Sequence, residues 1–509
     1  MTALVPMPVL LPMLGAALTV LGSRRATLQR VVAVTVVAAV AVLAAALLVT
    51  ADRRGPLVAT LGGWAAPVGI ALVADRLSAL LLLVSALVTM AVLVFAIDQR
   101  VTMEGGRGTS TTFHPMFLML TAGVSLAYLT GDLFTLFVAF EVTLTASYVL
   151  ITRSTNTVRI RANMTYVIVG LTSSLLFLTT IAMVYAATGT VNLADLAGKL
   201  GEQSGGVQTV LALLLVVVFG IKSAVVPLHL WLPDSYPHAP GPVAALFAGI
   251  LTKVSFYAIL RTQTLLFEHP APWGLLLGLA VATMLLGALG ALAQNDLNRV
   301  LSFLLISHIG VMLFGLAVFD AAGVAAATLY AAHHITVLAT LFLVVSLITQ
   351  RTGTVELDRM GGLARTAPGV AVLFGIAALT LAGVPPTAGF VAKLGLLQAG
   401  ASAGTATTIV AGAVVLASFL TLVALTRIWV RVFWSPWQPP HHDDDPADEL
   451  VVGTARSTPA MYAATAGLMA ASLAIAVFAG PLSALTARAG LDLVDREPYR
   501  VAVLGGRNR

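Results

Sequence analysis

The stretch GIKSAVVPLHLWLPDSYPHAPGPVAALFAGILTKVSFYAILR, residues 220–261, decides what kind of fold this chain can adopt. It contains two apolar runs with one lysine in each, Lys222 and Lys253, separated by a segment rich in proline. Proline removes a backbone donor and clashes with the preceding turn, so Pro227 predicts a broken helix. Inside a bilayer such a break persists only where it is buried in protein or lines a wet cavity. The stretch therefore predicts membrane helices with a polar interior.

The composition of the whole chain agrees with this reading. Of its 509 residues, 59% are hydrophobic and 10% are charged, and the mean hydropathy is +0.97. A soluble chain would carry about 25% charged residues. The composition excludes a cytosolic globular enzyme, a disordered protein and a nucleic-acid binder. The chain has no cysteine, which excludes disulfides, thiolate zinc sites and iron–sulfur clusters within it. We predict no cofactor and no metal.

Apolar runs, broken by charged residues, glycine and proline, predict an all-α polytopic membrane protein. At roughly 20 apolar residues per crossing, the runs provide about fourteen transmembrane helices. The predicted spans are 4–22, 29–50, 73–98, 113–131, 132–152, 162–188, 207–229, 240–262, 274–294, 298–319, 324–350, 370–398, 405–434 and 459–485.

Loop charges predict the orientation. Most arginines of the short loops follow odd-numbered helices, which places those loops in the cytoplasm and the N-terminus outside. The C-terminal tail does not fit, because an even helix count places its arginines outside as well. Either the count is wrong by one helix or the tail docks on a partner. The arginines concerned are Arg488, Arg496, Arg500, Arg507 and Arg509.

Lysine is rare in this chain. Lysine and arginine together number 28, but only four are lysines: Lys199, Lys222, Lys253 and Lys393. The last three lie inside apolar stretches. Arginine cannot be deprotonated in a protein, whereas a buried lysine can release its proton. Lysines in apolar runs can also snorkel from helix ends. Lys222 and Lys253 lie well away from the expected loops, so we interpret them as proton-carrying groups.

An ionisable group deep in a membrane helix costs about 2.5–3.5 kcal/mol on insertion scales, so such groups usually mark an ion pathway. The candidate catalytic residues are Glu141, Lys222, Lys253, His333, His334 and Lys393.

A second helix break is predicted beside Lys393, which follows Gly383, Pro385, Pro386 and Gly389. Interrupted helices in corresponding positions of two halves are typical of inverted-repeat transporters. An ordinary proline kink used for packing is the alternative for either break taken alone.

These residues suit a proton relay. A carboxylate near a lysine favours charge on both groups, while burial favours the neutral forms. Histidines titrate near physiological pH and suit the middle of the relay. Adjacent helical residues point about 100° apart, so we expect one of the two histidines, His333, to face the conduit. His308 is a candidate too, although a hydrogen-bonded packing role is expected there. His229 and His238 are expected at a helix end.

The segment HHDDDPADE, residues 441–449, pairs two histidines with a run of aspartates. We interpret it as a solvated, charge-rich loop rather than a metal site.

The motifs resemble the D subunits of the multisubunit Mrp-type Na+/H+ antiporters, a family related to the antiporter-like membrane subunits of respiratory complex I. The resemblance extends from about Gly131 to Lys393. FVAFEVTLTASYVLI places Glu141 at the family's glutamate, and the stretch 220–261 carries its two lysines. AQNDLNRVLSFLLISHIGVML resembles the following helix, and GVPPTAGFVAKLGLL resembles the broken helix with the terminal lysine. The chain departs from the family at Leu338, where a lysine is frequent.

The resemblance implies fourteen helices with two inverted five-helix repeats, and broken helices 7 and 12. It implies N-terminal helices 1–3 in residues 1–112, a first repeat in 113–262 and a second in 274–434. Helix 14 and the basic tail then occupy 459–509.

The leading hypothesis is a membrane subunit of a multisubunit monovalent cation (Na+)/proton antiporter, an ion transporter rather than an enzyme. It would lie in the bacterial plasma membrane, work with other membrane subunits, and move protons through the Glu/Lys/His relay. The alternative is a proton-pumping membrane subunit of a complex I-like NADH:quinone oxidoreductase or a membrane hydrogenase. A third hypothesis is a self-sufficient transporter of an organic solute.

Overall fold

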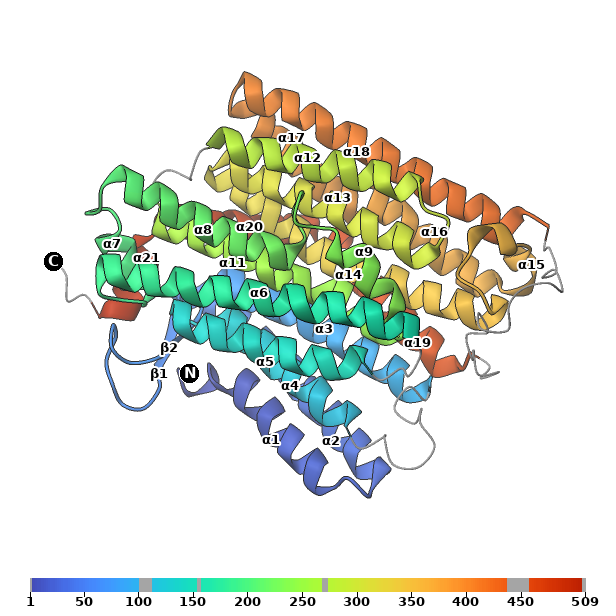
Figure 1. Ribbon diagram of the computed structural model, residues 1–509, viewed down its shortest axis with the longest axis horizontal. Coiled ribbons are helices and arrows are strands. Elements are labelled where there is room, and N and C mark those ends of the chain that lie inside the picture. The colour runs from blue at the N-terminus through green and yellow to red at the C-terminus, as the bar shows by residue number, and fades with distance from the viewer. Residues whose placement is uncertain (1, 100–111, 153–156, 268–272, 437–456, 506–509) are drawn as a thin grey trace.

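The computed structural model describes residues 2–99, 112–152, 157–267, 273–436 and 457–505, and it is almost entirely helical (Figure 1). Its elements in chain order are η1 (Thr2–Leu4), α1 (Met7–Leu21), α2 (Ala26–Arg54), β1 (Leu57–Thr60), β2 (Ala71–Ala74), α3 (Arg76–Asp98), α4 (Phe113–Leu129), α5 (Leu133–Ile151), α6 (Thr157–Thr188), α7 (Leu193–Lys199), α8 (Gly205–Ser223), α9 (Trp231–Ser235), η4 (Tyr236–His238), α10 (Gly241–Leu246), η5 (Phe247–Leu251), α11 (Thr252–Leu266), α12 (Trp273–Leu292), α13 (Leu297–Val318), α14 (Ala321–Thr352), η6 (Leu357–Arg359), α15 (Leu363–Thr366), α16 (Pro368–Ala382), α17 (Ala388–Ser402), α18 (Thr405–Trp429), η7 (Val430–Trp434), α19 (Pro459–Val477), α20 (Ala479–Val494) and α21 (Glu497–Leu504).

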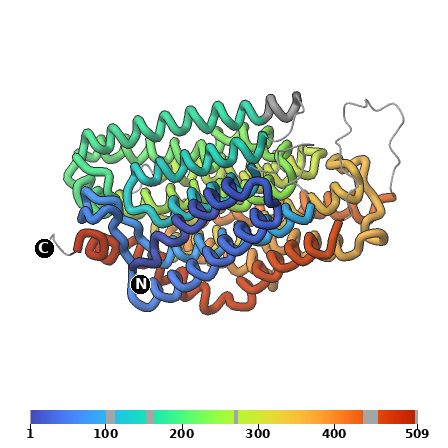
Figure 2. Tube along the Cα trace, turned by 90° about the horizontal axis from the view of Figure 1, so that it is seen from below, coloured from blue at the N-terminus to red at the C-terminus, as the bar shows by residue number. Residues whose placement is uncertain are grey.

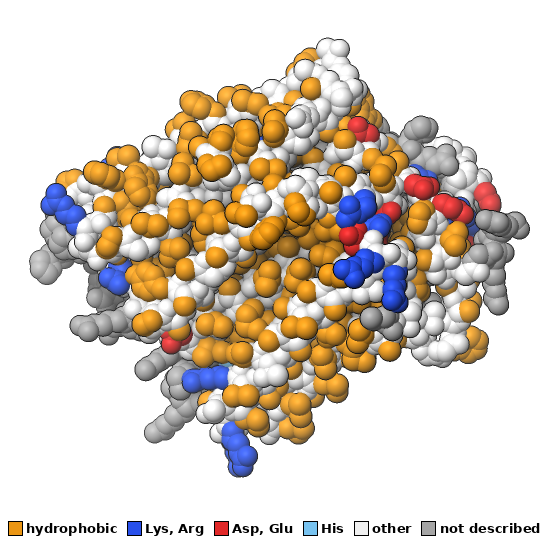
Figure 3. Space-filling model, turned by 180° about the vertical axis from the view of Figure 1, so that it is seen from behind, with side chains coloured by type: hydrophobic (Ala, Val, Ile, Leu, Met, Phe, Trp, Pro, Cys, Tyr) orange, Lys and Arg blue, Asp and Glu red, His pale blue; other side chains and the backbone are white. Residues whose placement is uncertain are grey.

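The prediction of a polytopic all-α membrane protein is confirmed. In the described part of the chain, 12 helical segments are long and apolar enough to cross a membrane, and Phe113–Leu129 and Pro368–Ala382 are shorter apolar helices. The total of fourteen crossings stays a prediction. The helices lie side by side along one direction (Figures 1 and 2), and hydrophobic side chains are spread over the visible face, with few charged ones among them (Figure 3). A surface of this kind suits contact with lipid or with neighbouring membrane subunits.

Both predicted helix breaks are present. Helix α8 ends at Ser223, four residues before Pro227, and α16 ends at Ala382, four residues before Pro386. Proline cannot donate to the carbonyl four residues earlier, so the carbonyl of the last residue of each helix has no helical donor. The following backbone is left-handed, with φ of 61° at Ala224 and 84° at Gly383.

One predicted span boundary is wrong, and one predicted span is divided at its expected break. The span 207–229 runs past the helix end at Ser223, so Lys222 lies in the last turn of α8 rather than far from a loop. The span 370–398 is two helices, α16 and α17, with residues 383–387 between them. Hydrophobicity continues past Ser223, and for this reason the apolar run extends beyond the end of α8.

The same local structure occurs twice, at α5 and at α13. Asp132 and Asp296 each cap the helix that follows, accepting from the backbone N–H of Thr135 and Arg299. Residues 131–133 bond to residues 191–193, and residues 295–297 bond to residues 355–357 in the same pattern. The neighbouring α7 and α15 lie at opposite ends of the molecule (Figure 1). This duplication supports inverted repeats; the domain boundaries 113–262 and 274–434 stay predictions.

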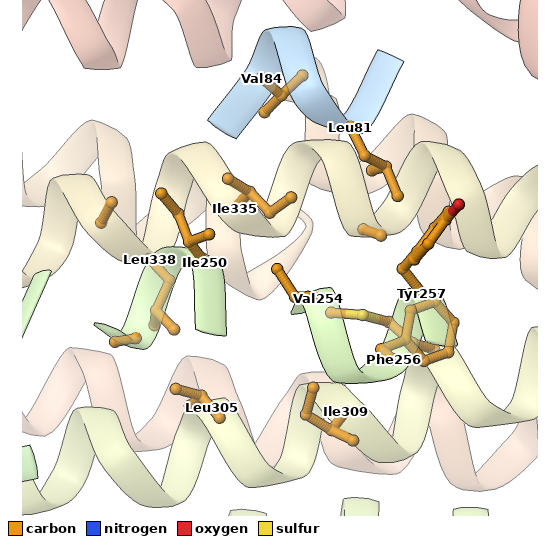
Figure 4. Close-up of a cluster of buried hydrophobic side chains, with 14 of the residues drawn as sticks. Leu81, Val84, Ile250, Val254, Phe256, Tyr257, Leu305, Ile309, Ile335 and Leu338 are labelled. Carbon is orange, nitrogen blue, oxygen red and sulfur yellow. The ribbon is translucent and has the colours of Figure 1, made fainter. Parts of the chain in front are cut away.

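Helix α14 forms the centre of the core. It packs against α3, α10, α13, α16, α17, α19 and α20, and its residues from Gly323 to Ile348 are all buried. Figure 4 shows Leu338 of α14 among Ile250 of η5 and Leu305 of α13. The position where the resembled family often carries a lysine is thus filled by an apolar side chain in an apolar cluster.

The described part of the basic tail, up to residue 505, docks on its own chain, which neither of the two sequence-based explanations anticipated; Arg507 and Arg509 lie outside the described residues. Arg488 pairs with Asp52 at 2.8 Å, and Asp492 pairs with Arg76 at 2.5 Å. Arg496 donates to the carbonyls of Thr264 and Phe267 at the end of α11. Cationic side chains commonly satisfy the last carbonyls of a helix in this way.

The tail also bears on the helix count. Both η1 and α21 contact β1, and the two ends of the chain lie at the same end of the molecule (Figures 1 and 2). An even number of crossings requires this arrangement. The last predicted span, 459–485, is divided between α19 and α20 at Phe478. The segment 441–449 lies outside the described residues.

Candidate functional site

Lys222 of α8 lies against Phe140 of α5, the residue that precedes Glu141 in the chain. The Lys222 ammonium lies 5.1 Å from the centroid of the Phe140 ring and donates to Ser174 Oγ of α6 at 3.3 Å. Glu141 is close enough to Lys222 to interact with it electrostatically. Its Oε1 is buried without a hydrogen-bond partner among the described residues. The two charges therefore attract each other without direct contact.

The helix break positions Lys222. The left-handed Ala224 ends α8, and Trp231 of α9 folds back to donate from its Nε1 to the carbonyl of Ile221 at 2.9 Å. A cavity of about 40 Å³ opens beside this bond, lined by Lys222, Ser173 of α6 and Ser255 of α11. A buried water needs roughly 10–15 Å³ of such volume, so the cavity accommodates a few water molecules between α8 and α11.

Lys253 lies on the next element, where the helix changes form. The π-helix η5 (Phe247–Leu251) directly precedes it, and its ammonium donates to the carbonyl of Ala248 at 2.5 Å. Lys253 is fully buried. Single π-helical turns often occur at functional sites. Lys253 is not among the residues that line the cavity beside Lys222, so the cavity does not join the two lysines.

His333 and His334 of α14 face different neighbours. A Cβ added to Gly389 of α17 would lie 3.1 Å from His333 Nε2, so His333 faces α17. The His334 ring stacks on His308 of α13 with centroids 5.0 Å apart. All four ring nitrogens of His333 and His334 are buried and have no hydrogen-bond partner in the described residues.

His308 is a hydrogen-bonded packing residue, as expected. Its Nδ1 lies 2.5 Å from Tyr330 Oη, and its Nε2 lies 3.4 Å from Thr421 Oγ1 of α18. His229 follows the end of α8, and His238 lies in η4, where its Nδ1 lies 2.8 Å from the carbonyl of Asp234. Both therefore lie beside helix ends.

Lys393 of α17 reaches back across the second break. Its ammonium donates to the carbonyls of Leu381 at 3.1 Å and Ala382 at 2.7 Å, the last two residues of α16. Lys393 is 5% exposed. Gly383 makes room for it, because a Cβ there would lie 2.8 Å from Lys393 Cδ.

Lys222 and Lys393 share one electrostatic setting. Lys222 is a residue of the last turn of α8, and the Lys393 ammonium binds the last carbonyls of α16, so each lysine is associated with the C-terminal end of a helix that stops inside the molecule. That end carries partial negative charge, which stabilises a nearby cation. Unwound carbonyls and half-helix C-termini bind cations in inverted-repeat transporters. The two breaks thus create two similar cation-stabilising positions.

The helices that carry the predicted residues pack against one another in a series. Helix α5 packs on α6, α6 on α8, and α8 on α11; η5 packs on α14, and α14 on α17. His333 interacts electrostatically with Lys393, and His334 with Lys253. Sequence reasoning missed Ser174, Trp231 and Tyr330, which contact this series. The position of Trp231 in the proline-rich break could have indicated its role. No sequence pattern marked Ser174 or Tyr330.

Interrupted helices, a duplicated local structure and ionisable groups in the core define a class of membrane proteins that move ions. The matching family profile is described as NADH:quinone oxidoreductase/Mrp antiporter membrane region, and it covers residues 130–421. This chain belongs to that family.

Individual relatives narrow the comparison. The chain is 40% identical over 437 residues to the D subunit of the Na(+)/H(+) antiporter of Alkalihalophilus pseudofirmus, covering 85% of this chain and 87% of that protein. It is similar to a chain of the Mrp complex from Dietzia sp., with a TM-score of 0.90, 33% identity and coverage of 99% and 100%. A chain of respiratory complex I from Thermus thermophilus matches with a TM-score of 0.78, 26% identity and coverage of 96% and 99%.

Proposed function

We propose that this chain is the D-type membrane subunit of a multisubunit antiporter that exchanges a monovalent cation, Na+, for protons. In this proposal the protons pass through Glu141, Lys222, Lys253, His333, His334 and Lys393. The chain is a transporter component of the bacterial plasma membrane and not an enzyme, as its antiporter relatives indicate.

The observation that carries the proposal is the position of Lys222 and Lys393 at the two helix breaks. A lysine at a helix C-terminus is stabilised as a cation, yet burial makes that charge expensive. The balance lets each lysine hold a proton or release it when a neighbouring charge moves. Arginine could not do this, because it stays charged.

The groups that lie between Lys222 and Lys393 suit proton transfer from one lysine to the other. The cavity beside Lys222 has room for water, and the unpartnered nitrogens of His333 and His334 are available to accept or donate protons. The apolar surroundings of Leu338 leave the histidines and water to carry the middle of the route. Glu141 serves as the counter-charge of Lys222 and changes the occupancy of that lysine as it gains or loses a proton.

The complex I-like alternative has weaker support. The Mrp-complex chain has a higher TM-score and a higher identity than the complex I chain. Lys393 also stands where one of the complex I subunits has a glutamate.

The test is purification in mild detergent followed by reconstitution. We expect small and large hydrophobic subunits to copurify, and Na+ addition to drive proton movement across vesicles that contain the complex. The chain alone should show no exchange, because the resembled proteins act as multisubunit assemblies. Copurified flavin or iron–sulfur subunits would favour the alternative, and exchange by the isolated chain would contradict the requirement for partners.

A further inference from the structure

Three residues of α11 form a polar stripe that the proposed relay uses only in part. Lys253, Tyr257 and Arg261 are spaced four residues apart, so they lie on one face of the helix. All three are buried, with Arg261 4% exposed. At 1.5 Å per residue, Arg261 lies about 12 Å from Lys253 along the helix axis, toward the end that holds both chain termini. Loop charges predict that this end is outside.

Tyr257 fills the middle of the stripe. Its hydroxyl donates to the carbonyl of Tyr128 at 2.7 Å, and Tyr128 Oη lies 3.2 Å from Ser85 Oγ of α3. Figure 4 shows Tyr257 on α11 at the edge of the apolar cluster that contains Val254 and Phe256. Polar contacts from α3, α4 and α11 thus meet one turn beyond Lys253.

Arg261 closes the stripe at its outer end. Its Nη2 pairs with Asp75 at 2.6 Å, and the side chains are 5% and 7% exposed. Its Nε donates to Tyr257 Oη at 3.3 Å. The guanidinium also lies against the rings of Tyr257 and Tyr499, 5.4 and 5.3 Å from their centroids. Arg261 thus contacts Asp75 and Tyr257 through different nitrogens, Nη2 and Nε, and links the stripe to the carboxylate.

The molecular surface begins directly beyond this pair. Arg76, next to Asp75, bonds to Asp52 at 2.8 Å and to Asp492 of α20, and Arg488 bonds to Asp52. These side chains are between 15% and 45% exposed. The tail helices therefore hold an ionic network over the outer end of the stripe, and Tyr499 of α21 covers Arg261 itself.

We propose that Arg261 is a fixed positive barrier that closes the outer end of the proton route at Lys253. A guanidinium cannot lose its proton, so it repels cations at every pH. Fixed arginines exclude cations from membrane pores by the same physics. Asp75, Tyr257 and Tyr499 are the positioning residues of the barrier. The inference rests on the proposed function and adds that the route leaks to the outside when Arg261 is neutral.

The experiment measures passive proton permeability of vesicles that contain the full complex, without Na+ and with a potassium diffusion potential. We expect Arg261→Gln to raise the permeability by about tenfold or more, which corresponds to a barrier lower by ~1.4 kcal/mol. Arg261→Lys should remain near wild type, because the charge remains. Arg488→Gln is the matched control, since it removes an arginine from the exposed network at the same end.

Asp75→Asn distinguishes the barrier from a purely structural role of Arg261. In that role, called a tether here, the ion pair with Asp75 only holds α11 in place. Removing Asp75 leaves the cation in place and no longer compensated by a carboxylate, so permeability should stay at or below the wild-type value. A tether would make Asp75→Asn and Arg261→Gln behave alike. Equal permeability of assembled Arg261→Gln and Arg488→Gln would overturn the proposal.

If Arg261→Gln does not assemble, the double variant Asp75→Asn/Arg261→Gln removes both charges and leaves no unpaired carboxylate. Raised permeability in it supports the barrier, and wild-type permeability or failure to assemble counts for a tether. Failure of the proposed function is visible separately, because the wild-type complex would then show no Na+-driven proton movement.

Discussion

The ammonium of Lys393 lies 2.7 Å from the carbonyl oxygen of Ala382, across a gap between two helices of one apolar run. The break at Pro386 leaves this carbonyl without its intrahelical donor. A buried carbonyl without a partner costs about 1–3 kcal/mol. The lysine therefore supplies the hydrogen bond that this carbonyl lacks, and the carbonyl in turn stabilises the charge of the lysine.

Arginine and histidine substitutions separate charge from titration at this position. We expect Lys393→Arg and Lys222→Arg to lose antiport, because a permanent cation cannot pass a proton on. Lys393→His and Lys222→His should retain part of the activity at lower pH, where histidine is protonated. Lys199→Arg is the control, since the Lys199 side chain is 41% exposed and pairs with Asp195 of the same helix. The measurement is antiport against pH at matched assembly, and full activity of both arginine variants would show that only charge is needed.

Glu141→Gln should abolish antiport while the complex still assembles. The substitution keeps the shape of the side chain but removes the counter-charge of Lys222. Glu202→Gln, at an exposed position between α7 and α8, should behave as wild type. Dye quenching in vesicles with equal amounts of complex measures the effect. Wild-type exchange by Glu141→Gln would remove this residue from the relay.

Gly383→Ala should impair antiport through Lys393. A Cβ at Gly383 would lie 2.8 Å from Lys393 Cδ, and φ there is 84°. Left-handed backbone costs a non-glycine residue roughly 1–2 kcal/mol. Gly353→Ala is the matched control, because φ is 74° and nothing lies within 4 Å of the added Cβ. We expect similar losses of thermal stability but a loss of exchange only for Gly383→Ala; equal exchange would show that the contact with Lys393 is unimportant.

Asp296 should make stability depend on pH. Burial raises the pKa of Asp296, although the backbone N–H groups of Arg299 and Asn298 and the charges of Arg299 and His238 act in the opposite direction. A raised pKa in the folded state means that folded protein binds more protons than unfolded protein. Stability therefore falls as pH rises from the ordinary value of about 3.9 through the raised value.

The Asn and Ala variants isolate this effect. Asp296→Asn keeps the helix cap and should remove the fall, so its stability relative to wild type improves with pH across that window. Asp296→Ala loses the cap as well as the charge and should be about 1 kcal/mol less stable than Asp296→Asn at every pH. Thermal unfolding of the purified complex between pH 4 and 8 checks both, and parallel curves for wild type and Asp296→Asn would contradict the prediction.

Much of the fold was predictable because a bilayer leaves few options. A membrane chain must satisfy its backbone within helices, so apolar length predicts the crossings. Pro227 and Pro386 predicted where two of them break, because proline acts locally. The unusual positions of Lys222, Lys253 and Lys393 in apolar runs predicted the candidate residues for the same reason, the cost of a buried charge.

The tertiary structure decided what these residues face. No local pattern predicts that Lys393 binds carbonyls eleven and twelve residues earlier, that His333 and His334 turn to different helices, or that the tail pairs with Asp52 and Arg76. Such contacts join segments far apart in the sequence, and each depends on packing of the whole bundle. The sequence by itself determined which groups are ionisable and buried; only the packed helices determined which of them can act on one another.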